Sequence, residues 1–200
     1  MKTQRRRNRL ANIAFFLPVV VIIGLVVFGY FYATRPGTLD VAAWAQNKYL
    51  SEPEQSTPIH VSAMVGSTSG TTPFSLSLPA GQYEVTYPAI PWYYTPSSNE
   101  VAVTNGRTVY STGAYDVIVK IIALSSAGFN ATTVSALHGV TPVIWINTSG
   151  SNLELEVSGQ GNYILSPDQN FTAIFSSPGT YQFATPSGSS TSTSGIITVE

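Results

Sequence analysis

The most prominent hydrophobic pattern in the chain is an uncharged run near its N-terminus. It extends over 24 residues from Leu10 to Ala33 and reads LANIAFFLPVVVIIGLVVFGYFYA. About 20 apolar residues are enough for a helix to cross the hydrocarbon core of a bilayer. The sequence therefore predicts one transmembrane helix over residues 10–33, with the lipid bilayer as its partner.

Basic residues lie mainly on one side of this run. Five of the nine in the chain precede it, as Lys2, Arg5, Arg6, Arg7 and Arg9. Residues 35–200 carry four basic and ten acidic residues. An excess of Lys and Arg beside a transmembrane helix marks its cytoplasmic side. The pattern predicts a cytoplasmic tail over residues 1–9 and extracellular domains after the helix. A cleaved signal peptide is the alternative, but its apolar region is normally shorter, about 7–15 residues.

After the predicted helix, residues 34–57 indicate a stalk. It begins with a mildly helical stretch at residues 40–50 and continues with a segment rich in Pro, Ser and Glu. From residue 58 onward, segments of alternating or clustered β-branched and aromatic residues recur between turn residues. We predict strands at residues 60–65, 74–78, 83–87, 100–104, 108–112, 117–124, 141–147, 153–157, 171–175, 180–185 and 195–199. This spacing favours two small β-sandwiches, at residues 58–115 and 116–200.

The first predicted sandwich contains a turn motif. Thr72-Pro73 precedes one predicted strand, and Leu78-Pro79-Ala80-Gly81 precedes the next. Proline presets the backbone for a turn, and glycine tolerates a positive φ. The arrangement resembles PEGA-type and related carboxypeptidase-regulatory-like domains. That resemblance implies a spacer or an adhesive module.

The second predicted sandwich resembles a cupredoxin. The segments that carry the resemblance are Val143-Ile144-Trp145-Ile146-Asn147, Pro178-Gly179-Thr180-Tyr181-Gln182-Phe183 and Gly195 to Val199, together with Phe129, Val134 and Gly139. The resemblance implies a Greek-key sandwich. The positions that match the family's copper ligands are Asn152, Thr185, Gly188 and Thr193. Blue copper requires imidazole and thiolate ligands, so we expect a cupredoxin-like domain without copper or any other cofactor.

Other chemistry is sparse in the sequence. There is no cysteine, and the two histidines, His60 and His138, have no partner at a catalytic spacing. We therefore expect no enzymatic activity, and the acidic exported part makes nucleic acid a poor partner. Two features remain as candidates. Trp92, Tyr93 and Tyr94 form either an interaction surface or a cover for the core, and Asn130, Asn147 and Asn170 lie in N-glycosylation sequons.

The sequence thus predicts a membrane-anchored extracytoplasmic structural or interaction protein. We expect other membrane or cell-surface subunits as its partners. Two alternatives share its features. Second subunits of terminal oxidases also join a membrane helix to an exported cupredoxin, and their quinol-using versions lack copper ligands. A pilin-like filament subunit would use the apolar segment as a filament core, although Arg9-Leu10-Ala11 is a poor match to a pilin processing site.

Overall fold

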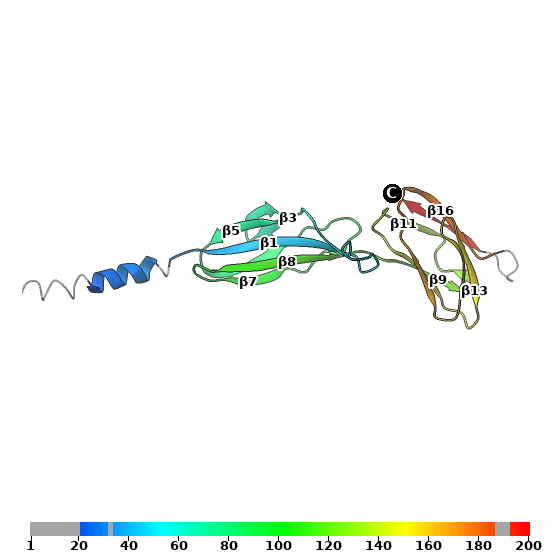
Figure 1. Cartoon of the computed structure of the whole chain (residues 1–200), viewed down its shortest axis with the longest axis horizontal. Helices are drawn as coiled ribbons and strands as arrows, with labels where there is room; N and C mark the ends of the chain where they lie inside the picture. Colours follow the sequence, from blue (N-terminus) through cyan, green and yellow to red (C-terminus); the bar gives the residue numbers. More distant parts are fainter. Residues whose placement is uncertain (1–20, 32–33, 187–192) are drawn as a thin grey trace, which may run out of the picture. The chain divides into compact units, whose positions relative to one another are not determined.

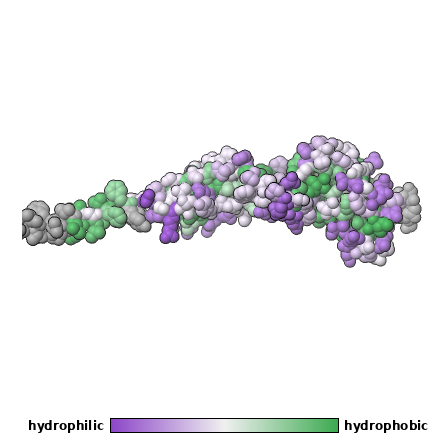
Figure 2. All heavy atoms as spheres, in the orientation of Figure 1, coloured by the Kyte–Doolittle hydropathy of each residue, from purple (hydrophilic) through white to green (hydrophobic). Residues whose placement is uncertain are grey.

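A computed structural model describes residues 21–31, 34–186 and 193–200 (Figure 1). Residues 21–31 form a helix in which every residue is exposed, and hydrophobic residues dominate it (Figure 2). The rest of the predicted transmembrane helix, residues 10–20 and 32–33, lies outside the described residues, as does the predicted tail. Among the residues described, no helix has both the length and the apolar character needed to cross a membrane.

The remaining described chain consists of strands and their connections, which confirms the all-β class. The strands are β1 (Gly37–Gln46), β2 (Ser56–Pro58), β3 (Ser62–Val65), β4 (Thr68–Thr71), β5 (Phe74–Leu78), β6 (Gly81–Thr86), β7 (Asn99–Val103), β8 (Thr108–Asp116), β9 (Lys120–Ser125), β10 (Gly128–Phe129), β11 (Thr133–Ala136), β12 (Val143–Asn147), β13 (Leu153–Val157), β14 (Gly161–Leu165), β15 (Asn170–Ala173), β16 (Gly179–Ala184) and β17 (Ser194–Val199).

The chain forms two compact units from interleaved segments. Unit 1 consists of Met1–Ala42, Ser62–Thr86 and Ser98–Thr112, and unit 2 consists of Ala43–Val61, Tyr87–Ser97 and Gly113–Glu200. The chain therefore passes from one unit to the other five times. Both β1 and β8 begin in unit 1 and end in unit 2.

Unit 1 contains the strands that follow the predicted turn motif. β4, β3, β6 and β7 form one sheet in that order, and β5 pairs antiparallel with the first half of β1. The side chains of Ala63, Val65, Val85 and Val103 are buried in this unit. The Thr72-Pro73 pair leads directly into β5, and Gly81 begins β6. The turn residues thus start strands where the sequence predicted them.

The structure corrects the prediction for residues 40–50. Most of this stretch belongs to β1 and not to a helix. Burial alternates along β1, with Leu39, Val41, Ala43 and Ala45 buried and the intervening residues more exposed. A strand places alternate side chains on opposite faces, so β1 contributes one face to the core. The region predicted as a stalk therefore supplies a sheet strand.

The C-terminal part of unit 2 is a sandwich of two mixed sheets. One sheet has the order β10-β9-β12-β15, and the other has the order β11-β17-β16-β13-β14. β12 runs parallel to β9, and β11 runs parallel to β17. The core between the sheets is built around Trp145, Phe175 and Phe183, each at most 2% exposed. Phe183 lies with its ring centroid 5.9 Å from that of Trp145. This packing fixes β16, which ends one residue before Thr185, one of the predicted copper positions.

Candidate functional site

Two of the four positions equivalent to copper ligands, Thr185 and Thr193, lie where β16 ends and β17 begins. The backbone N–H of Thr185 donates to the carbonyl oxygen of Thr193 at 3.0 Å. In return, the N–H of Thr193 donates to Oγ1 of Thr185 at 3.0 Å. Asn152 is exposed immediately before β13, and Gly188 lies outside the described residues. The structure thus brings two of the four predicted positions into direct contact.

This donor set does not fit a blue-copper centre. Copper of that type is held by one thiolate and two imidazoles, whereas Thr185 and Thr193 offer neutral hydroxyl groups. The hydroxyl of Thr185 already accepts a backbone N–H, and Oγ1 of Thr193 is buried and finds no partner among the described residues. Within those residues, no cluster of three or more His, Cys, Asp or Glu side chains could hold a metal ion. The contact between the two threonines extends the β16–β17 ladder.

The three sequons differ sharply in their surroundings. Asn130 and Asn170 are exposed. Asn147 is fully buried at the end of β12, and its Nδ2 donates to the carbonyl oxygens of Ser151 at 2.8 Å and Leu165 at 2.7 Å. A glycan on Asn147 would break both bonds and require the side chain to reach solvent. The structure therefore argues against Asn147 as an acceptor and leaves the other two sequons accessible.

The predicted aromatic surface is held against the end of β8. The N–H of Tyr94 donates to the carbonyl oxygen of Asp116 at 2.8 Å, and the N–H of Ile118 donates to that of Trp92 at 2.8 Å. Trp92 and Tyr93 are half-buried, and burial raises the pKa of the Tyr93 hydroxyl. Tyr94 remains 61% exposed. Of the three predicted aromatics, Tyr94 is the one most available to a partner.

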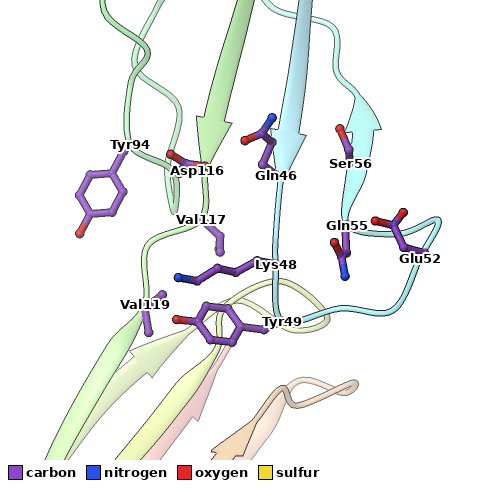
Figure 3. A pocket seen from close by; sticks show the side chains of 10 residues that line it. All are labelled: Gln46, Lys48, Tyr49, Glu52, Gln55, Ser56, Tyr94, Asp116, Val117 and Val119. Atoms are coloured by element: carbon purple, nitrogen blue, oxygen red, sulfur yellow. The ribbon is translucent and has the colours of Figure 1, made fainter.

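Tyr94 also lines a pocket of about 550 Å³ in unit 2. The side chains around the hollow come from the end of β1, the loop after it, β2 and the end of β8 (Figure 3). The lining residues are Gln46, Lys48, Tyr49, Glu52, Gln55, Ser56, Tyr94, Asp116, Val117 and Val119. Tyr94 is the only one of them that the sequence singled out. The others have no common local motif, because they come from two separate stretches of chain, residues 46–56 and 116–119.

Backbone hydrogen bonds fix the walls of this pocket. The N–H of Val117 donates to the carbonyl oxygen of Gln46 at 3.0 Å, which joins the ends of β8 and β1. Gln46 faces Ser56 in the β1–β2 register. The N–H of Tyr49 donates to Oδ1 of Asn47 at 3.2 Å. The pocket is therefore held by the ladder and by a buried asparagine, and does not depend on its exposed side chains for its shape.

The pocket combines two exposed or half-exposed aromatic rings with polar groups of both signs. Nζ of Lys48 lies 5.3 Å from the centroid of the Tyr49 ring, within range of a cation–π interaction. Glu52 and Asp116 supply two carboxylates, and the two glutamines supply amides. The only aliphatic side chains in the lining are Val117 and Val119. Such a lining suits a polar ligand that has a flat apolar face.

No family model matches the chain, and no curated protein matches it. Among solved structures, it is similar to a mutant amicyanin in a Cu(I) form, with 16% identity over 41% of this chain and 82% of that chain and a TM-score of 0.35. It is similar to the TIE protein of Bacillus anthracis, with 13% identity over 83% of this chain and 33% of that chain and a TM-score of 0.41. It is also similar to a mutant of the shaft pilin SpaA from Lactobacillus rhamnosus GG, with 11% identity over 83% of this chain and 98% of that chain and a TM-score of 0.35.

The two-sheet sandwich in the C-terminal part of the chain agrees with the sandwich fold that the cupredoxin resemblance implies. The resemblance to PEGA-type domains and the membrane anchor stay predictions.

Proposed function

We propose that this chain is a membrane-anchored extracytoplasmic structural or interaction protein and an accessory subunit of a membrane or cell-surface assembly. The observation that carries the proposal is the contact between Thr185 and Thr193. At these positions a cupredoxin-like domain would hold a metal, and here they hydrogen-bond to each other and continue the sheet. Electron transfer depends on a bound cofactor, so binding is the role best supported by this domain.

The proposed anchor is supported by the apolar segment at residues 10–33. In its described part, the exposed fractions of the large hydrophobic side chains run from 46% at Val27 to 69% at Phe28 and Phe31. Exposed apolar surface of this extent is unfavourable in water and favourable among lipid tails. The five basic residues before it would favour the cytoplasmic leaflet, which carries anionic lipids.

The proposed orientation can be tested with single cysteines, because the natural chain has none. A membrane-impermeant maleimide applied to intact cells should label a Ser158→Cys variant in the exposed turn after β13. A Thr3→Cys variant in the basic tail should be labelled only after lysis. Labelling of Thr3→Cys in intact cells, or protection of Ser158→Cys, would contradict the proposed topology.

Partners can be identified by purifying the tagged full-length chain from its native membranes in mild detergent, followed by mass spectrometry. Recovery with cell-surface subunits in fixed stoichiometry supports the proposal. Recovery with haem-containing redox subunits would favour the alternative of a copper-less oxidase subunit. In that case the cupredoxin-like domain would serve the respiratory complex as a scaffold.

The exposed apolar helix also favours a second candidate, a filament subunit. Helices of neighbouring copies could cover the same side chains that lipid would cover in an anchored protein. This candidate requires the apolar helix to leave the membrane and enter a helical assembly. Electron microscopy of shed material and N-terminal sequencing of the mature chain distinguish the two: an intact basic tail on membrane-extracted monomers excludes the filament.

A further inference from the structure

We propose that the pocket at the ends of β1 and β8 binds a neutral oligosaccharide, with the Tyr94 ring as the platform on which one sugar stacks. The inference rests on the proposed function, because it assumes that the pocket faces the outside of the cell. It adds a ligand class to what is otherwise a general binding role.

Tyr94 holds a fixed and exposed position in the pocket. Its backbone N–H is bound to Asp116, and the neighbouring Tyr93 forms a β-bridge with Val117. A pyranose ring has a face of C–H groups that packs against an aromatic ring, as other apolar groups do. Because the backbone is already fixed and a tyrosine has only two side-chain torsions, little conformational entropy would be lost on binding.

The pocket also contains polar side chains that have no partner in the described part of the chain. Among the described residues, the side chains of Gln46, Glu52, Gln55 and Asp116 make no hydrogen bond or ion pair. Carboxylates accept two or more hydrogen bonds, and amides both donate and accept. Adjacent sugar hydroxyl groups also both donate and accept, so one amide or carboxylate can bind two of them. The pocket therefore offers the hydrogen-bonding pattern that a polyol needs.

Further aromatic surface lies around the pocket. Tyr49 forms the lower wall in Figure 3, and Lys48 extends across the pocket between Tyr49 and Val117. Trp44 lies two residues before Gln46 on the same face of β1 and is 37% exposed. Rings at both Tyr94 and Tyr49, with Trp44 beyond, suit a ligand of more than one sugar. A volume of about 550 Å³ is also within the usual range for small-ligand sites.

The same residues disfavour other ligand classes. An anion would meet two carboxylates and one ammonium group, from Glu52, Asp116 and Lys48. A purely apolar ligand would find only two valines, and Val117 is just 6% exposed. A peptide would need either an apolar side-chain pocket or a free strand edge directed into the hollow. A neutral sugar is the class that uses both the rings and the polar groups.

The test measures binding of neutral trisaccharides to the purified full-length chain in a zwitterionic detergent, since maltoside detergents would themselves compete. Binding is measured by isothermal titration calorimetry. The probes are maltotriose, cellotriose, mannotriose and triacetylchitotriose, and an uncharged hexapeptide is the comparison ligand. We expect at least one trisaccharide to bind with a dissociation constant of roughly 0.1–1 mM. We expect Tyr94→Ala to weaken that binding about tenfold, and Tyr94→Phe to change it less than threefold.

Tyr110→Ala is the matched control, because Tyr110 is 74% exposed on β8 in unit 1 and does not line the pocket. It should leave binding unchanged. Asp116→Asn, which keeps the shape of the side chain, should weaken binding severalfold. Absence of trisaccharide binding up to about 10 mM, binding of the peptide instead, or equal losses in Tyr94→Ala and Tyr110→Ala would each overturn the proposal. Cysteine labelling that still shows the expected topology would confine such a failure to the ligand class and leave the proposed function standing.

Discussion

Asn147 is the residue whose replacement should destabilise the C-terminal sandwich most clearly. Its side chain is fully buried and makes four hydrogen bonds. Nδ2 donates to the carbonyl oxygens of Ser151 and Leu165, and Oδ1 accepts from the N–H of Ser149 at 2.8 Å and from its hydroxyl at 2.7 Å. The side chain thereby joins the end of β12 to β14 and to the turn before β13.

Asn147→Ala removes all four bonds and leaves their partners behind. A hydrogen bond contributes about 1 kcal/mol to the free energy of unfolding, and a buried donor or acceptor left without a partner costs about 1–3 kcal/mol. The carbonyl of Leu165 belongs to a nearly fully buried residue, so water cannot readily replace the amide there. We expect a loss of about 3–5 kcal/mol, a large share of the 5–15 kcal/mol typical of a whole protein.

The measurement is urea unfolding of the full-length chain, monitored by tryptophan fluorescence, to which the buried Trp145 contributes with Trp44 and Trp92. With a slope of about 2 kcal/mol per molar urea, the expected loss lowers the midpoint by roughly 2 M. Asn130→Ala is the matched control, because Asn130 is an exposed sequon asparagine whose Oδ1 accepts one bond, from the N–H of Ala123 at 2.7 Å. A loss below about 1 kcal/mol in Asn147→Ala, or one no larger than in Asn130→Ala, would refute the reasoning.

Two further predictions concern packing and pH. Gly195→Ala would place a methyl group against the Phe183 ring and should cost about 1–3 kcal/mol in urea unfolding, whereas Gly150→Ala, which has open space around it, should be nearly neutral. An equal loss of stability in both variants would contradict this account. Burial raises the pKa of the Tyr115 hydroxyl, and a smaller electrostatic effect of Tyr87 raises it further. The folded state therefore holds this proton more tightly than the unfolded state, and stability should fall as the pH rises above about 10. Tyr115→Phe removes the 2.7 Å hydrogen bond to the carbonyl oxygen of Pro88 and should make stability fall less steeply above that pH. If the variant loses stability at alkaline pH as steeply as the natural chain, this prediction is wrong.

Apart from β1, the long alternating strands were predicted well from the sequence because their pattern is local. Each of the eleven predicted segments overlaps an observed strand. β1 was misjudged because its alanines favour a helix in isolation, although Leu39, Val41, Ala43 and Ala45 already alternate in the sequence. Short strands such as β2 and β10 could not be predicted, because three or two residues carry no period and are stabilised by their neighbours in the sheet.

The candidate sites show the same limit. The sequon at Asn147 is a local motif that says nothing about burial, whereas the alternation of Val143, Trp145 and Asn147 along β12 places this asparagine on the inner face. The pocket could not be predicted at all. Gln46 lies on β1, Tyr94 lies in the segment that precedes β7, and Asp116 lies at the end of β8. These three residues meet only because tertiary hydrogen bonds bring the three parts of the chain together.

The interleaved path of the chain has a consequence for how this protein would fail under stress. A protein whose domains follow one another can lose a whole domain through one cut in one connecting peptide. Here the chain passes between the units five times, so a protease that cuts one exposed crossing leaves the units joined by the other four.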